Sequence, residues 1–288
     1  MIQELVNHDW ELICIVRKQH NFGNLKIQQI YGDLSKPESL VYKFADVEDI
    51  DVIFHLAAEL PVNNPQNDPA RYIVNNTLGT VKLLDVAKEL NCRFIYTSSI
   101  PVIGIPQEIP ITESHPLRPR SYYHLSKLFG ELACDMQRRI RDGKIFSLRI
   151  SSPYGPGMPE NAVLAKFVNL ALRSQNIELL GSGQRTQNFV HVRDIVNAIK
   201  LTTQAKIAGT YNLAGLSSVS MESLAHIILD LIPDSSSEIL FSEEPDNEEK
   251  YRWDVDLTNS KKQLGYYPKI SLEQGLDEYI QWIRSSMK

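Results

Sequence analysis

The sequence lacks several features that mark specialised protein classes. It has only three cysteines in 288 residues, Cys14, Cys92 and Cys134, with no CxxC or Cys/His spacing. An odd number in this arrangement argues against a disulfide framework or a zinc site and is typical of a reducing compartment, where we expect all three to be small buried apolar residues. No apolar run approaches the eighteen or so residues that span a bilayer, and no signal peptide begins the sequence. We therefore expect a cytoplasmic protein with no membrane partner.

The sequence also has no excess of positive charge. Lys and Arg number 30 against 35 Asp and Glu, giving a formal net charge of −5 with no basic block. The electrostatic footprint of a nucleic-acid or anionic-membrane binder is thus absent. Gly and Pro are not enriched and no internal repeat occurs, so the composition predicts one large globular domain or a domain with a small appendage.

Short β-branched and aromatic runs alternate with longer stretches of helical spacing. The runs predict strands at residues 11–16, 51–56, 92–98 and 144–150, separated by helices such as 75–90 and 122–140. This alternation predicts an α/β fold with a doubly wound, parallel, Rossmann-type sheet. Strand segments that are apolar almost throughout indicate that helices cover both faces of the sheet.

After residue 155 the rhythm loosens, which predicts two domains. Residues 1–155 would form the Rossmann-type dinucleotide-binding domain. Residues 156–288 would form a smaller, partly interwoven α/β lobe that binds substrate. The expected elements of this lobe are helices near 162–173, 192–202, from 220 and after 271, with a strand at 210–214.

The beginning of the sequence departs from the dinucleotide-binding pattern. In that fold the first strand runs into a glycine-rich turn whose N–H groups meet the pyrophosphate at a helix N-terminus. Here residues 2–8 look like the second half of the first helix, and residues 11–16 like the second strand. We expect some 15–25 residues with the glycine turn upstream of Met1 in the native polypeptide, about a strand plus half a helix. Without them, nicotinamide binding should be much weaker.

Tyr123 and Lys127 are four residues apart in a predicted helix, so they share one face about one turn apart. A phenol pKa near 10 must fall by roughly 3 units for acid/base work at neutral pH, which requires about 4 kcal/mol. A lysine charge at about 4 Å in an effective dielectric near 20 supplies about that much. A neighbouring lysine can therefore lower the phenol pKa far enough for acid/base work. A tyrosine four residues before a lysine is nevertheless a common pattern by chance.

Hydroxyl and small side chains follow two neighbouring strands. Thr97-Ser98-Ser99 ends the strand predicted at 92–98, and the strand at 51–56 leads into Ala57 and Ala58. Open α/β sheets bind ligands at the carboxyl ends of their strands. The hydroxyls can there hold a substrate oxygen, and the small residues allow a flat cofactor to lie close to the backbone.

With these residues, the sequence resembles the extended short-chain dehydrogenase/reductase family, the NAD-dependent epimerase/dehydratase group. The resemblance covers nearly the whole chain from residue 2, with motifs in the same order and spacing. The matching residues are His55-Leu56-Ala57-Ala58, Asn76-Thr77-Leu78-Gly79-Thr80, Thr97-Ser98-Ser99 with Gly104, Tyr123 with Lys127, Leu148-Arg149, Tyr154-Gly155-Pro156-Gly157, Phe189-Val190-His191-Val192-Arg193-Asp194, Tyr211-Asn212-Leu213, Asp256, Leu264-Gly265-Tyr266 and Pro268.

The resemblance implies catalytic roles for three residues. Tyr123 would be the acid/base, Lys127 would lower its pKa and bond the nicotinamide ribose, and Ser99 would bond the reacting oxygen. In such enzymes a hydride passes between a substrate carbinol carbon and the nicotinamide while the tyrosine moves the proton. Substrates are commonly nucleotide-linked sugars held by the C-terminal lobe.

It also implies a set of cofactor-binding residues. Asp33, followed by Leu34, matches the family position beside the adenine, and Asn76 matches an asparagine of the active-site hydrogen-bond network. The loop that lines the cofactor is matched by His55, Leu56, Ala57 and Ala58.

Several of these residues have structural alternatives. His55 could be a satisfied core histidine, Asp33 could cap the turn before Pro37, and Asn76 could brace its helix. For Asp194 we favour a structural role as the N-cap of the following helix.

Arginines are the candidate partners of ligand phosphates. Arg185 and Arg252 suit a substrate phosphate, and Arg17 at the end of the second strand could meet a 2′-phosphate, which favours NADP over NAD. Each could instead be solvated. The glycine turn at 181–183 indicates a hairpin rather than a phosphate cradle, and the acidic stretch 243–249 a surface loop.

The sequence therefore predicts an NAD(P)-dependent epimerase or ketoreductase of a nucleotide sugar, with no metal site and, by family habit, a homodimer. A 4,6-dehydratase is disfavoured because Ile100-Pro101 stands where such enzymes carry Asp-Glu. Ile103 replaces the usual tyrosine before Gly104, which changes the local pocket. The competing hypothesis is a catalytically silent, truncated or degenerate relative that binds no dinucleotide.

Overall fold

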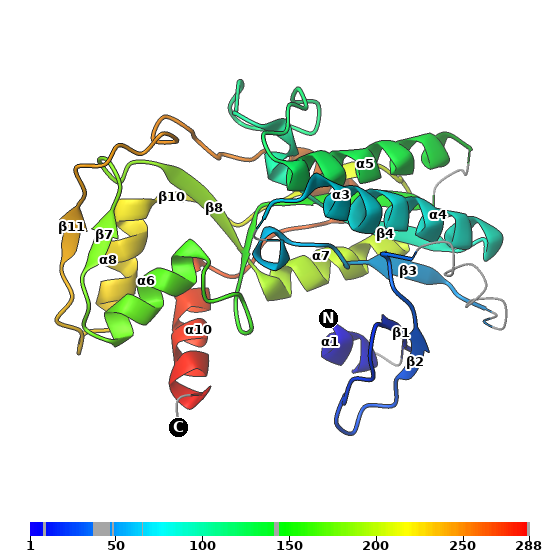
Figure 1. Cartoon of the computed structure of the whole chain (residues 1–288), viewed down its shortest axis with the longest axis horizontal. Coiled ribbons are helices and arrows are strands. Elements are labelled where there is room, and N and C mark those ends of the chain that lie inside the picture. The colour runs from blue at the N-terminus through cyan, green and yellow to red at the C-terminus, as the bar shows by residue number, and fades with distance from the viewer. Residues whose placement is uncertain (8–9, 37–46, 48, 65, 141–143, 287–288) are drawn as a thin grey trace. The chain divides into compact units, whose positions relative to one another are not determined.

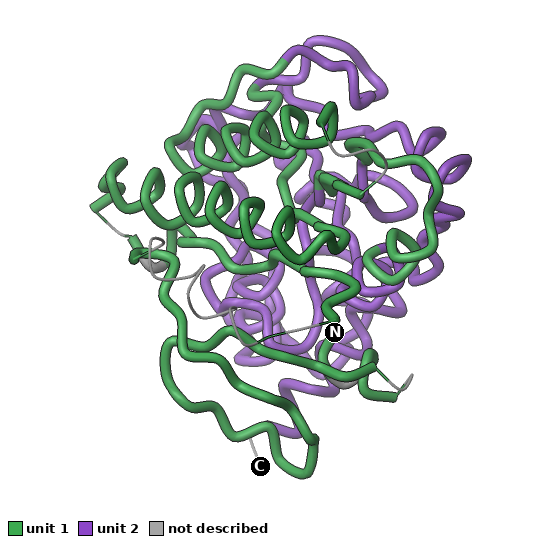
Figure 2. The backbone as a smooth tube through the Cα atoms, turned by 90° about the vertical axis from the view of Figure 1, so that its right-hand side faces the viewer, with its two compact units in different colours: residues 1–104, 117–149, 199–211 green, residues 105–116, 150–198, 212–288 purple. Residues whose placement is uncertain are grey.

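A computed structural model describes residues 1–7, 10–36, 47, 49–64, 66–140 and 144–286. The chain forms two compact units that are interleaved along the sequence (Figure 2). Unit 1 comprises Met1–Gly104, Leu117–Arg149 and Ile199–Tyr211, and unit 2 comprises Ile105–Pro116, Ile150–Ala198 and Asn212–Lys288. The division predicted at residue 155 stays a prediction.

Unit 1 holds parallel strands in two separate sheets (Figure 1). One sheet pairs β1 (Ile13–Val16) with β2 (Gln28–Tyr31), after the short helix α1 (Ile2–Val6). The other has the order β3-β4-β5-β9, formed by β3 (Val52–His55), β4 (Arg93–Ser99), β5 (Ile145–Ile150) and β9 (Thr210–Leu213), which extends into unit 2.

No described strand joins β1 to β3. The parallel strands alternate with helices, so the predicted Rossmann-type α/β class is confirmed.

Helix α5 (Tyr122–Ile140) lies against β4, beside α4 (Gly79–Glu89) (Figure 1). Its buried face includes Lys127, Gly130 and Glu131. A Cβ added at Gly130 would lie 2.5 Å from Cζ of Tyr96 on β4, so only glycine allows this close approach. The tyrosine hydroxyl donates to the carbonyl of Lys127 at 3.2 Å, which fixes the position of α5 along the strand.

The helix predicted over 75–90 starts earlier and irregularly. Asp68 caps α3 (Pro69–Tyr72) by accepting from Ala70 N, and a π-helical segment, η3 (Ile73–Leu78), leads into α4. π-Helical turns are rare and occur often at functional sites. Here the segment places the Asn76 side chain in the interior.

The core of unit 1 lies between β4, β5, α4 and α5. Cys92 and Cys134 are buried in it as predicted, whereas Cys14 on β1 is only half-buried, which corrects the expectation for that residue.

Unit 2 contains short strands and several helices, three of which enclose a separate core. The strand order β10-β8-β6 joins β10 (Ser218–Ser220), β8 (Thr186–His191) and β6 (Ser152–Tyr154), while β7 (Ile177–Leu179) pairs in parallel with β11 (Ile239–Phe241). The core packs α6 (Val163–Leu172), α8 (Met221–Leu231) and α10 (Leu272–Ser286). Unit 2 also contains α9 (Thr258–Leu264) and the first part of α7 (Val192–Gln204), which continues into unit 1. The short 3-10 helices η2 (Pro61–Asn63) and η4 (Ile100–Ile103) belong to unit 1.

Two predictions for unit 2 were wrong. The turn at 181–183 does not close a hairpin, because the flanking strands β7 and β8 pair with different partners. Asp194 does not cap α7: it lies in the first turn of that helix and accepts hydrogen bonds from the backbone N–H groups of Lys269 and Ile270, all at 3.1 Å. In both cases the deciding partner lies far away along the chain.

In the described part of the chain, no helix is both long and apolar enough to cross a bilayer.

Candidate active site

Lys127 is almost completely buried at the base of the candidate site. Its Nζ donates to the carbonyl oxygen of Thr97 at 2.8 Å and lies 5.0 Å from the centre of the Tyr96 ring. Burial lowers the pKa of Lys127 to about 8, and the Glu131 carboxylate acts in the opposite direction. The side chain is therefore a cation at neutral pH, held at the carboxyl end of β4.

Tyr123 lies one turn earlier on α5 and is half-buried. Its ring packs edge-on against the rings of Tyr72 and His124, with centroid distances of 6.1 and 5.1 Å. Burial, together with Tyr72, raises the pKa of Tyr123 to about 12. This is opposite to the lowering expected from Lys127, because desolvation disfavours the phenolate and the ammonium bonds Thr97.

The three hydroxyl residues at the end of β4 have different environments. Thr97 Oγ1 donates to the carbonyl of His55 at 3.0 Å, which ties β4 to β3. The Ser98 hydroxyl is buried and has no hydrogen-bond partner among the described residues. Ser99 is half-buried at the end of the strand. Buried hydroxyls rarely remain unpaired, so this strand end has hydrogen-bonding capacity to offer a ligand.

Asn76 connects the loop after β3 with α5. Its Oδ1 accepts from Glu59 N at 2.6 Å, and its Nδ2 donates to the Glu59 carbonyl at 3.1 Å and to Ser126 Oγ at 2.9 Å. Ser126 Oγ in turn donates to the carbonyl of Tyr123 at 2.7 Å. These bonds brace the helix that carries Tyr123, and the part of Asn76 in a substrate network stays a prediction.

His55 is a buried histidine with a partner on α4. Its Nε2 lies 2.8 Å from Thr80 Oγ1, and burial next to the Lys127 charge lowers the pKa of His55 to about 3. The ring is therefore neutral, as the core-histidine alternative predicts. Of the residues that follow it, Leu56 and Ala57 are exposed and Ala58 is half-buried, so this loop offers small and apolar surface to a ligand.

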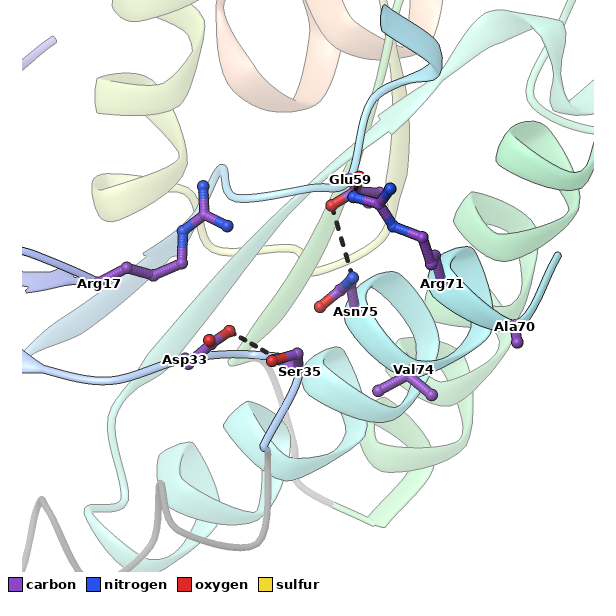
Figure 3. Close-up of a pocket in the computed structure, with 8 residues that line it drawn as sticks. All are labelled: Arg17, Asp33, Ser35, Glu59, Ala70, Arg71, Val74 and Asn75. Atoms are coloured by element: carbon purple, nitrogen blue, oxygen red, sulfur yellow. Dashed lines mark hydrogen bonds and ion pairs between the residues drawn. The ribbon is translucent and has the colours of Figure 1, made fainter. Parts of the chain in front are cut away.

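A cavity of about 390 Å³ lies in unit 1 (Figure 3). Its size suits a small ligand. The loops after β1, β2 and β3 and the helical segments α3 and η3 supply its lining residues: Arg17, Asp33, Ser35, Glu59, Ala70, Arg71, Val74 and Asn75.

Two of the sequence-predicted cofactor residues meet in this cavity. Arg17 is exposed and its guanidinium reaches towards the cavity, opposite Asp33 (Figure 3). Asp33 Oδ1 accepts from Ser35 N at 2.9 Å, and this bond lowers the pKa of the carboxyl. Asp33 therefore caps its turn and also faces the cavity. Leu34 instead packs on Gly79, where an added Cβ would lie 3.0 Å from the leucine Cβ.

The predicted phosphate-binding arginines of unit 2 have protein partners. Arg185 forms ion pairs with Asp246 at 3.0 Å and Glu248 at 3.5 Å. Arg252 Nη1 donates to the carbonyl oxygens of Glu249 and Tyr251 at 2.7 and 3.2 Å. The acidic stretch 243–249 is largely exposed, as predicted, but two of its carboxylates hold Arg185.

Sequence reasoning missed several buried polar residues around the site. Glu59 bonds Asn76 and forms an ion pair with Arg71, and Glu131 forms a buried ion pair with Arg149. The position of Glu131, four residues after Lys127, was a usable signal. Its partner on β5 could be found only in the fold. Among the described residues, no group of three or more His, Cys, Asp or Glu is placed to hold a metal ion.

The model of the NAD dependent epimerase/dehydratase family matches residues 1–214 of the chain. The chain is 27% identical over 277 residues to UDP-glucuronic acid decarboxylase 1 of Xenopus tropicalis, which covers 94% of this chain but 63% of that protein. It therefore spans less than two thirds of that relative.

Solved structures share the fold over almost the whole chain. UDP-glucose 4-epimerase from Thermotoga maritima superposes with a TM-score of 0.89 at 23% identity, covering 100% of this chain and 95% of that one. MoeE5 in complex with UDP-glucose and NAD has a TM-score of 0.82 at 25% identity, covering 100% and 95%.

Proposed function

The chain belongs to the NAD dependent epimerase/dehydratase family, and on that premise we propose that it is an NAD(P)-dependent epimerase or ketoreductase. Its substrate would be a hydroxyl or keto group of a nucleotide sugar. The observation that carries the proposal is the placement of Lys127, buried and bonded to Thr97 at the end of β4, one helical turn after Tyr123 on α5. A buried cation one helical turn from a phenol, at the ligand-binding edge of a parallel sheet, supports this chemistry.

Tyr123 is the proton-transfer group. With its pKa raised to about 12 by burial, the phenol is protonated at neutral pH and can donate to a substrate oxygen. Lys127 stabilises the phenolate left behind, and its remaining N–H groups can reach a ribose hydroxyl. Ser99 holds the reacting oxygen. The dinucleotide supplies the hydride acceptor or donor when it is bound.

The residues around the cavity fit part of a dinucleotide. The Asp33 carboxylate suits a hydroxyl or amine donor and the Arg17 guanidinium suits a phosphate, and the exposed small residues after His55 let a flat group approach the backbone. Because Arg17 stands where an acidic residue would take the ribose 2′-hydroxyl, we favour NADP over NAD. Asn76 supports this surface from behind through its bonds to Glu59.

The relatives support a nucleotide sugar as substrate. MoeE5 was solved with UDP-glucose and NAD, and UDP-glucuronic acid decarboxylase 1 acts on a UDP-sugar acid by name. Epimerisation or keto reduction needs only Ser99, Tyr123 and Lys127, whereas Ile100-Pro101 offers no carboxylate pair for 4,6-dehydration. The similarity to the decarboxylase makes decarboxylation of a sugar acid a second candidate. Arg185 and Arg252 are the proposed phosphate partners, and Arg185 would have to leave its carboxylates.

An exposed apolar stripe on α5 supports a homodimer. Its side chains recur at helical spacing along one face, which is typical of a helix that packs against another. The stripe consists of Tyr122, Phe129, Leu132, Met136 and Ile140.

The function is tested by incubating the protein with NAD or NADPH and UDP-glucose, UDP-glucuronic acid or dTDP-glucose. Product sugars, CO₂ and cofactor oxidation are then measured. Tyr123→Phe should abolish turnover and leave cofactor affinity nearly unchanged, while the matched variant Tyr122→Phe at the exposed neighbour should keep turnover. Equal turnover in both variants would remove Tyr123 from its role.

One observation favours the competing hypothesis of a silent relative: in the described residues the parallel strands fall into two sheets between β1 and β3. A titration of NADPH fluorescence against the 288-residue protein separates the two. Micromolar binding supports the enzyme and contradicts the expectation that nicotinamide binding is much weaker without the glycine turn, whereas absence of binding at millimolar cofactor supports the silent relative only if a form that carries the glycine turn also fails to bind.

A further inference from the structure

A buried ion pair lies on the same helix face as Lys127. Arg149 on β5 donates to Glu131 on α5 through Nε, 3.0 and 3.1 Å from the two carboxylate oxygens, and through Nη2 at 2.8 Å. Both side chains are about 95% buried. The two-point geometry holds the carboxylate in one orientation, and the ion pair spans the helix and the strand beneath it.

The region around Lys127 contains two buried cations and one buried carboxylate. Lys127 and Arg149 are both buried cations, and the carboxylate of Glu131 is the anion that acts on each of them. Glu131 follows Lys127 by four residues, which places the two side chains about one turn apart on one face of α5. A buried lysine without a counter-charge loses its proton readily, because burial disfavours the charged form.

We propose that Glu131, held in place by Arg149, is a positioning residue that keeps Lys127 protonated in the site. The inference rests on the proposed function, because that function needs the cation beside Tyr123. Glu131 acts through Lys127 and touches neither substrate nor cofactor.

The other described titratable groups around Lys127 have weaker or no stabilising effect on its charge. On α5, Cys134 stays a neutral thiol because burial raises its pKa to about 12, and burial lowers the pKa of His124 to about 4. On β4, Tyr96 presents its ring, and burial raises the pKa of its phenol. On β3, His55 is neutral. Among the groups that oppose the desolvation of Lys127, Glu131 has the largest effect and Cys134 a smaller one.

The experiment uses the pH dependence of stability, which needs no turnover. Because the pKa of Lys127 is about 8 in the folded chain and higher in the unfolded chain, the unfolded state binds more protons between these values. Stability therefore rises with pH across that window. Removing the Glu131 charge lowers the folded pKa, so the rise should begin at lower pH; in a variant that also lacks Arg149, the loss of that second cation partly offsets the shift.

Glu131→Gln/Arg149→Met is the principal variant, because it removes the pair without leaving Arg149 buried alone. Unfolding by urea is followed from pH 6 to 10, with and without Lys127→Met. The single variant Arg149→Met should raise the folded pKa of Lys127, so the rise in stability should begin at higher pH. The reason is that the Glu131 carboxylate then no longer pairs with Arg149 and acts on Lys127 alone. A shift to lower pH that vanishes in the Lys127→Met background supports the proposal. No shift, or one that persists in that background, overturns it.

In the active protein, the upper pH limit of kcat/KM should move to lower pH by the same amount in the double variant. If the unsubstituted protein turns over no nucleotide sugar, the proposed function fails, and the stability measurement still decides whether Glu131 controls Lys127. An unchanged pH limit in an active double variant would overturn the proposal.

Discussion

At Gly130, α5 lies close against the Tyr96 side chain of β4, and Gly130→Ala tests whether this contact sets the position of the site. The added Cβ would lie 2.5 Å from Cζ and 3.0 Å from Cε1 of Tyr96. The ring is fully buried and its hydroxyl is bonded to the Lys127 carbonyl, so it has no space into which to retreat. The helix must move instead, and it carries Tyr123 and Lys127.

Two effects of opposite sign decide the magnitude. Alanine in a helix interior is favoured over glycine by about 1 kcal/mol. Overpacking a rigid core costs typically about 1–3 kcal/mol, and the overlap here places the cost near the upper end. We expect a net loss of about 2 kcal/mol, which lowers Tm by roughly 4–8 °C in a domain of this size. Turnover should fall as well.

Thermal unfolding and turnover are measured on the purified variant beside Gly275→Ala. That glycine faces a tyrosine in the same way, with Cζ of Tyr154 2.7 Å from an added Cβ, but it lies on α10 in unit 2. The control should lose similar stability and keep a larger share of turnover. A Gly130→Ala protein with a higher Tm than the parent would refute the reasoning, because the helix propensity of alanine would then outweigh the overpacking against Tyr96.

Three further outcomes are expected. The pKa of His55 is lowered from about 6.5 to about 3, so the unfolded state binds more protons between these values and the free energy of unfolding falls on acidification. His55→Gln should therefore remove about 2 kcal/mol of the stability that the parent protein loses between pH 7 and 5. The control variant His226→Gln, at an exposed histidine, should leave that loss unchanged. NADPH should bind more tightly than NADH, with Arg17→Ala but not Lys18→Ala erasing the difference in a fluorescence titration; equal affinities in the parent protein would contradict this. Leu132→Glu/Met136→Glu should convert a dimer to a monomer in light scattering, and an assembly that survives both charges would show that the α5 stripe is not its interface.

The helix that carries the site could be predicted accurately because its signals are local. The spacing of apolar residues gave residues 122–140, and the structure has α5 at Tyr122–Ile140. The π-helical start of the helix at η3 could not be predicted, since it depends on Asn76 bonding Glu59 and on the packing of α3. The turn at 181–183 was misassigned for the same reason: the pairing of β7 with β11 is decided some sixty residues later in the chain.

By itself the sequence determined the alternation of strands and helices, the shared helix face of Tyr123 and Lys127, and the hydroxyls that end β4. All three follow from periodicities of two and of 3.6 residues, which neighbouring residues establish. Only the tertiary structure decided that Lys127 bonds Thr97, that Glu131 bonds Arg149 and that Asn76 bonds Ser126. These partners are 18 to 50 residues apart, and the packing of helices on the sheet brings them together, because buried polar groups must find partners wherever the fold places them.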